Sequence, residues 1–155
     1  MPRPFVRSVF LLATLIVLPA GCSSRDAESS DREGSSSGGA INWISSWPEA
    51  QKRASADDKL IMIDFYTDWC TWCKVLDQKT YPDPAVVKLA AGIVSIKLDA
   101  EKKPGSELAK KYQVSGYPAI VFVDKNGRSV GLIDGYYPPN EFAKRMKAII
   151  SSHRR

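Results

Sequence analysis

The stretch that decides the fold runs from position 66 to 74 and reads Tyr66-Thr67-Asp68-Trp69-Cys70-Thr71-Trp72-Cys73-Lys74. Its two cysteines, Cys70 and Cys73, are three positions apart, so they can close as a disulfide and reopen. If a helix begins at Cys70, its unpaired N–H groups and its dipole stabilise a thiolate at that end. Such a pair is suited to exchanging electrons with the disulfides of other proteins.

The cysteine pair has two structural alternatives, a static disulfide and half of a zinc site. A zinc site needs about four ligands. The other soft donors of the chain are Cys22 and His153, and both lie near the ends of the sequence. His153 falls in a basic tail, which is typical of a solvated residue. The sequence therefore favours redox chemistry and predicts no metal.

Length and composition are those of one soluble domain with a core. The chain has 155 residues, of which 44% are hydrophobic and 25% charged. The net charge of +5 is modest, and no dense stripe of Lys and Arg with interleaved aromatic residues occurs. Nucleic-acid binding therefore has little support.

The N-terminus has the pattern of an export signal, which we expect to span residues 1–21. Two arginines precede the apolar run 9–18, which is too short to cross a bilayer of about 30 Å as a helix. The run ends in Leu18-Pro19-Ala20-Gly21-Cys22, which resembles a bacterial lipobox. Pro19 stands where a lipobox usually has leucine. The resemblance implies that Cys22 is lipidated; the alternative is an ordinary secretory signal with an incidental cysteine.

Residues 22–40 follow as a segment rich in Ser and Gly that has almost nothing to bury. Such a composition predicts a disordered tether. A low-complexity tail without a role fits the composition equally well. We expect the globular domain to occupy residues 41–155.

The pattern of that domain predicts a mixed α/β fold. Helices are expected at 47–54, 74–79, 85–91, 104–112 and 140–150, and strands at 60–66, 93–99, 119–124 and 128–133. Asp83 should cap the third helix, and Asn126-Gly127 should supply the positive φ angles of a tight hairpin. Early strands separated by helices pair in parallel, while the hairpin is antiparallel. The result is a mixed central β-sheet with helices on both faces.

The chain resembles the thioredoxin superfamily across residues 47–150. The matching segments are Ile61-Met62-Ile63-Asp64-Phe65-Tyr66 leading into Trp69-Cys70-x-x-Cys73-Lys74, then Lys97-Leu98-Asp99, and Ser115-Gly116-Tyr117-Pro118 at the family's cis-proline loop. Together with Tyr81-Pro82-Asp83-Pro84-Ala85-Val86, they look most like the periplasmic thioredoxin-like domain of transmembrane disulfide reductases and its stand-alone relatives. Thioredoxin itself has Gly-Pro where this chain has Thr71-Trp72, so the resemblance does not fix the strength of the reductant.

The resemblance implies roles for the two thiols and for two residues near them. Cys70 would be the nucleophile, and Cys73 would be buried and act as the resolving thiol. Asp64 matches the family's buried acid, which would relay protons to Cys73 through water; the alternative is an exposed carboxylate at a strand end. Lys97 would pair with Asp64, or it would face solvent.

The resemblance also implies a substrate-binding surface. Pro118 would follow a cis peptide bond, and the Tyr117 backbone would pair with a substrate strand. The proline ring would also keep metal from the two thiols. Trp69 and Trp72 would form an apolar surface for partner docking, although either could instead be packed in the fold.

These expectations describe a membrane-tethered thiol–disulfide oxidoreductase of the bacterial cell envelope, periplasmic or otherwise extracytoplasmic. It would reduce disulfide-bearing exported proteins with its dithiol alone, without a cofactor, and would touch the membrane through its lipid anchor only. An upstream dithiol electron donor is needed because that compartment is oxidising. The alternatives are a disulfide oxidase or isomerase, and a copper- or haem-assembly thiol chaperone.

Overall fold

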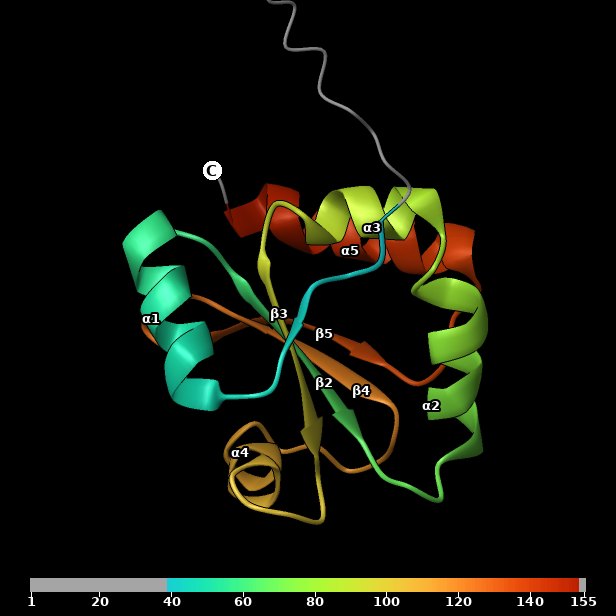
Figure 1. Cartoon of the computed structure of the whole chain (residues 1–155), viewed down its shortest axis with the longest axis horizontal. Coiled ribbons are helices and arrows are strands. Elements are labelled where there is room, and N and C mark those ends of the chain that lie inside the picture. Colours follow the sequence, from blue (N-terminus) through green and yellow to red (C-terminus); the bar gives the residue numbers. More distant parts are fainter. Residues whose placement is uncertain (1–38, 154–155) are drawn as a thin grey trace, which may run out of the picture. The chain divides into compact units, whose positions relative to one another are not determined.

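The computed structural model describes residues 39–153 of the chain. The expected signal peptide, Cys22 and all but the last two residues of the expected tether lie outside these residues. Five strands form one mixed sheet in the order β1-β3-β2-β4-β5 (Figure 1). Their bounds are β1 Trp43–Ile44, β2 Ile61–Tyr66, β3 Val94–Asp99, β4 Ala119–Val123 and β5 Ser129–Asp134.

Helices cover both faces of this sheet, as the sequence predicts. Their bounds are α1 Trp47–Asp57, α2 Thr71–Val75, the π-helical turn η1 Leu76–Thr80, α3 Pro84–Ala90, α4 Gly105–Lys111 and α5 Pro139–His153. Buried residues of α1 and α4 pack on one face, and those of η1, α3 and α5 pack on the other. No helix among residues 39–153 is both long and apolar enough to cross a membrane.

Strand β2 lies at the centre of the sheet, and this position explains its nearly continuous apolar sequence. It pairs in parallel with β3 and antiparallel with β4. Its odd-numbered residues from Ile61 to Phe65 belong to the core beneath α1 and α4, while Met62 belongs to the core beneath η1, α3 and α5. Because side chains alternate along a strand, Asp64 faces the same side as Met62. The one carboxylate of β2 is thereby directed to the side covered by the helix that follows the cysteines.

Two elements differ from the sequence-based expectation. Strand β1 was not predicted, because its two residues show no alternating pattern and are ordered by pairing with β3. The helix expected at 74–79 begins earlier, at Thr71, and its N-cap is Cys70, which confirms the expectation that Cys70 stands at a helix N-terminus. The other boundaries agree within a few residues, and Asp83 caps α3 as predicted by accepting the N–H groups of Ala85 and Val86.

The hairpin between β4 and β5 also differs in detail. Among the described residues of this turn, Gly127 has a positive φ, 75°, and Asn126 does not. The Asp124 carboxylate accepts the N–H groups of Asn126 and Arg128, and the Gly127 N–H donates to the Asp124 carbonyl. A carboxylate that organises the turn in this way favours a longer loop with one left-handed residue. The expectation of positive φ at both Asn126 and Gly127 was therefore wrong.

Candidate active site

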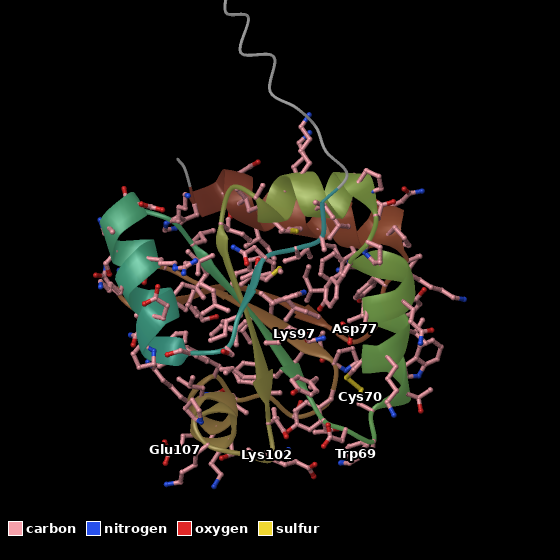
Figure 2. All side chains as sticks on the ribbon, in the orientation of Figure 1. Trp69, Cys70, Asp77, Lys97, Lys102 and Glu107 are labelled. Carbon is pink, nitrogen blue, oxygen red and sulfur yellow. A yellow bond between two sulfur atoms is a disulfide. The ribbon has the colours of Figure 1, made fainter. Side chains whose placement is uncertain are left out.

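Cys70 and Cys73 form a disulfide at the start of α2 (Figure 2), with an S–S distance of 2.08 Å. The loop from β2 delivers them, and the Cys70 N–H donates to the Thr67 carbonyl. Both cysteine side chains are 4% exposed. Cys73 is buried, as expected, and in this oxidised form Cys70 is buried to the same extent.

The N-terminus of α2 is directed at the sulfur of Cys70. The Cys73 backbone N–H donates a hydrogen bond to Cys70 Sγ over 3.1 Å. Helix α2 continues without a break into η1, so the dipole of both elements acts on this end. When the disulfide opens, the same N–H group and dipole remain in place to stabilise a thiolate on Cys70.

Asp64 is a buried acid close to this helix. Its residue is 1% exposed, so the alternative of an exposed strand end is wrong. Its Oδ2 lies 3.3 Å from Lys97 Nζ, and within residues 39–153 its Oδ1 has no hydrogen-bond partner. Burial raises the pKa of Asp64 to about 6, and the positive charge of Lys97 limits that rise. A carboxyl with this pKa can both give and take a proton near neutral pH.

Lys97 is shared between two carboxylates. Besides Asp64, its ammonium pairs with Asp77 of η1. Burial by itself would lower the pKa of Lys97, but the Asp64 and Asp77 carboxylates outweigh burial and raise it. The expectation that Lys97 pairs with Asp64 is confirmed. Sequence reasoning missed Asp77, although its position four residues after Cys73 places the two on one face of a helix.

Three aromatic rings surround the same ammonium group. Lys97 Nζ lies 5.5 Å from the ring centre of Trp43, 5.2 Å from that of Tyr66 and 5.5 Å from that of Tyr81. These rings hold the cation by cation–π attraction while restricting its access to water. Burial and the neighbouring Asp64 raise the pKa of Tyr81 well above its ordinary value. None of the four segments that meet here is adjacent in sequence, which is why Trp43 and Tyr81 were not predicted.

The cis-proline loop lies at the same end of the sheet as the cysteines. The Tyr117–Pro118 peptide bond is cis, as the resemblance implies. Ala119 pairs with Phe65 in the antiparallel register of β4 and β2, so the loop before β4 lies next to the loop after β2. The Tyr117 and Trp69 rings meet edge to face at a centroid distance of 6.0 Å. Substrate contacts of Tyr117 and Pro118 stay a prediction.

Trp69 and Trp72 are 65% and 56% exposed, so neither is a core residue. The Trp69 indole N–H donates to the Glu101 carboxylate over 3.1 Å. Trp72 stacks on Tyr136 with centroids 5.0 Å apart. Each ring therefore has one supporting contact and stays more than half exposed, and Figure 2 shows Trp69 near Cys70.

Metal ligation finds no support in the part of the chain that is described. Residues 39–153 contain no group of three or more His, Cys, Asp or Glu side chains placed to hold a metal ion. The chemistry available at this site is that of the two thiols, one buried acid and the cation beside it.

Comparison with known proteins gives a family match over most of the domain. Residues 47–150 match the model of the "Thioredoxin-like domain" family. Among curated proteins, the chain is 32% identical to the thiol:disulfide interchange protein DsbD of Haemophilus ducreyi over 108 residues. The match covers 66% of this chain and 19% of that protein, so the chain corresponds to less than a fifth of this relative.

Solved structures that resemble the described domain also have the thioredoxin fold. A candidate disulphide-isomerase from Bacteroides thetaiotaomicron is 36% identical, with a TM-score of 0.65, and the match covers 73% of this chain and 95% of that one. A thioredoxin from Thermus thermophilus is 31% identical, with a TM-score of 0.64, over 72% of this chain and 88% of that one. The thioredoxin fold predicted from the sequence is confirmed.

Replacing the buried acid should stabilise the protein at neutral pH. The raised pKa means that folding favours protonated Asp64, so wild-type stability falls as the pH rises from about 3.8 to about 6. At pH 7 the ionised Asp64 lowers the free energy of unfolding by about 3 kcal/mol, because its pKa rises from 3.8 to about 6 and each pKa unit corresponds to about 1.36 kcal/mol. Asp64→Asn should therefore unfold at higher urea concentration than wild type at pH 7, and this gain should vanish below about pH 4.

The control for this measurement is Asp134→Asn, which removes an exposed carboxylate from β5. It should leave the pH dependence of unfolding unchanged. Equal stability of Asp64→Asn and wild type at pH 7, or a gain that persists below pH 4, would contradict the assignment of a raised pKa to Asp64.

Proposed function

The chain belongs to the thioredoxin-like domain family, and on that premise we propose that it is a protein-disulfide reductase working outside the cytoplasm. The domain is a thiol–disulfide oxidoreductase of the Cys-x-x-Cys type. The observation that carries the proposal is the Cys70–Cys73 disulfide at the N-terminus of α2, with the Cys73 N–H directed at Cys70 Sγ. This arrangement favours Cys70 as the thiol that meets the substrate.

The reaction consists of two thiol–disulfide exchanges. The Cys70 thiolate attacks one sulfur of the substrate disulfide, forms a mixed disulfide and expels the other substrate sulfur as a thiolate. Cys73 then loses its proton and attacks Cys70 Sγ, which closes the Cys70–Cys73 disulfide and releases the second substrate thiolate. Two electrons pass to the substrate, whose thiolates take up two protons. An upstream dithiol must then reduce the pair again.

Asp64 is assigned the proton transfer of the second exchange. Its unpartnered Oδ1, its burial and its pKa of about 6 suit a group that accepts the proton of Cys73 through water. Lys97 supports this role because its positive charge lowers the free-energy cost of an ionised Asp64 in an apolar surrounding. Asp77 competes for the same ammonium, so it also sets how strongly Lys97 compensates Asp64.

Substrate recognition is assigned to the surface around the disulfide. The Tyr117 backbone, beside Pro118, would pair with an extended substrate segment, which is a common mode of peptide binding. The exposed faces of Trp69 and Trp72 would cover apolar side chains on either side of the substrate cysteine. The partners that fit are exported proteins carrying disulfides.

The membrane tether is proposed from the sequence alone. The apolar run 9–18 and the lipobox-like stretch that ends at Cys22 support export and lipidation, and residues 23–40 would link the anchor to the domain. A relative named as a thiol:disulfide interchange protein fits a role in passing electrons between thiol pairs. The oxidase or isomerase alternative has a specific observation in its favour, the 36% identity to a candidate disulphide-isomerase.

Removing the resolving thiol should trap substrates. In Cys73→Ser, the mixed disulfide between Cys70 and a partner cannot be resolved from within the protein, so disulfide-linked adducts should accumulate and disappear on reduction. Non-reducing electrophoresis of cell extracts, followed by mass spectrometry, measures them. Cys70→Ser is the matched control and should trap few partners. Equal adduct levels in both variants, or none in Cys73→Ser, would count against Cys70 as the attacking thiol.

The reduction potential separates a reductant from an oxidant. A reductase should equilibrate near the value of thioredoxin, about −270 mV, whereas a strong oxidant lies near about −120 mV. Equilibration of the purified protein in redox buffers, read out by thiol alkylation, gives the value. A potential near the upper figure would reverse the proposed direction and favour the oxidase alternative.

Lipidation is tested at Cys22. Wild-type protein should incorporate labelled fatty acid and remain with the membrane fraction, whereas Cys22→Ala should incorporate none and lose that association. The disulfide reductase activity of the purified variant should be unchanged, because the domain lies far along the chain from this residue. Membrane association of Cys22→Ala equal to that of wild type would rule out the lipid tether.

A further inference from the structure

A groove between α3 and α5 combines an apolar floor with a basic rim. Leu89, Ala143 and Ile150 line the floor, and the side chains of Lys88, Lys144 and Lys147 stand along it. We call this surface the α3–α5 groove. All three lysines are exposed, and within residues 39–153 none of them takes part in an ion pair. Several lysines elsewhere are paired, namely Lys59, Lys97, Lys102, Lys103 and Lys125.

The two helices that form the groove carry a positive charge excess. Helix α3 has Lys88 and no acidic residue within its bounds, and α5 has three Lys or Arg side chains, besides His153 in its last turn, against Glu141 as its one acidic residue. One of the three, Arg145, lies over the Tyr137 ring. The Asp83 carboxylate lies beside the groove, where it accepts the N–H groups of Ala85 and Val86, and in an adjoining hollow Asp57 and Asp58 are paired with lysines. The surface is therefore suited to an anionic partner with some apolar character.

The groove lies away from the active site and near the point where the chain enters the domain. In Figure 1, α3 and α5 form the upper edge, whereas Cys70 and Trp69 are labelled in the lower half of the same view in Figure 2. The first described residues, 39–41, line a hollow together with Asp77, Tyr81 and Pro82, immediately before α3. An anchor on Cys22 can lie at most about 60 Å of extended chain from residue 39. The described part of the chain therefore begins on the side of the domain where α3 starts.

We propose that the α3–α5 groove docks on the surface of an anionic lipid bilayer, an inference that rests on the membrane tether of the proposed function. Lipid phosphates would meet the three ammonium groups, while the lysine stems lie along the apolar floor. A short tether makes this contact frequent, because it keeps the domain close to the surface. In the docked orientation the disulfide and the two exposed tryptophans face away from the bilayer and stay open to partners.

The experiment uses the full chain on lipid vesicles. One set is phosphatidylcholine alone, and the other contains about one quarter phosphatidylglycerol, a fraction that gives an anionic surface potential. Labelling of lysines by an amine-reactive reagent is read residue by residue with mass spectrometry. On anionic vesicles, Lys88, Lys144 and Lys147 should be labelled several-fold more slowly than on neutral vesicles. Lys52, Lys110 and Lys111, which are exposed on α1 and α4, should be labelled equally on both.

Charge reversal supplies the matched variants. Binding of wild type to anionic vesicles should also slow backbone hydrogen exchange in peptides of α3 and α5. A triple variant of the groove should lose this protection: Lys88→Glu, Lys144→Glu and Lys147→Glu. A control triple variant on α1 and α4 should keep it: Lys52→Glu, Lys110→Glu and Lys111→Glu. High salt should also abolish it, because exposed charges are screened. Equal labelling of both lysine sets on anionic vesicles, or equal effects of the two triple variants, would overturn the docking proposal.

Failure of the tether gives a different result. Flotation with neutral vesicles reports the lipid anchor alone, because these vesicles offer the lysines no anionic surface. A chain that did not float with neutral vesicles would contradict the tether. Flotation on anionic vesicles that depends on Lys88, Lys144 and Lys147 would still support the groove. Reductase activity in solution should be the same for both triple variants, so a defect in catalysis is recognised separately.

Discussion

The pairing of β2 with a strand on each side is the constraint on which the site depends. Its parallel partner β3 brings Lys97 beside Asp64, and its antiparallel partner β4 brings the loop of Pro118 beside the loop of the cysteines. A slip of one residue in either register would turn Asp64 to the opposite face of the sheet, away from the helix of the cysteines. The backbone hydrogen bonds of one central strand thus position the thiols, the buried acid and the cis-proline loop together.

The buried charge is tolerated because it is shared. Asp64 pairs with Lys97, and that lysine has two carboxylates and three aromatic rings around it. An isolated carboxylate at this depth would be far more costly. Because Asp77 belongs to the helical segment that follows the cysteines, the electrostatics of the acid and the position of that segment are linked. The raised pKa of Asp64 is the result of incomplete compensation, since burial outweighs the lysine.

Local sequence patterns predicted most of the fold and the members of the site that belong to known motifs. The apolar run of β2, the cap at Asp83 and the face of α5 each depend on neighbouring residues, so they can be recognised in one stretch of chain. Asp77, Trp43 and Tyr81 could not be recognised in that way, because they meet only around Lys97 in the folded protein. Strand β1 was missed because its pairing with β3 decides it. The hairpin was predicted, but the positive φ expected at Asn126 was wrong because the carboxylate of Asp124 organises the turn.

The equal burial of Cys70 and Cys73 has a consequence for how electrons leave the protein. Exchange requires a thiolate to approach a sulfur along the S–S axis, so a covered disulfide reacts slowly with small thiols and oxidants that lack a docking surface. A partner that docked against Trp69 and the loop of Tyr117, as proposed above, would gain access that a freely diffusing molecule does not. On the proposed function, the low exposure of both cysteines would make the choice of partner depend on access to the disulfide as well as on reduction potential.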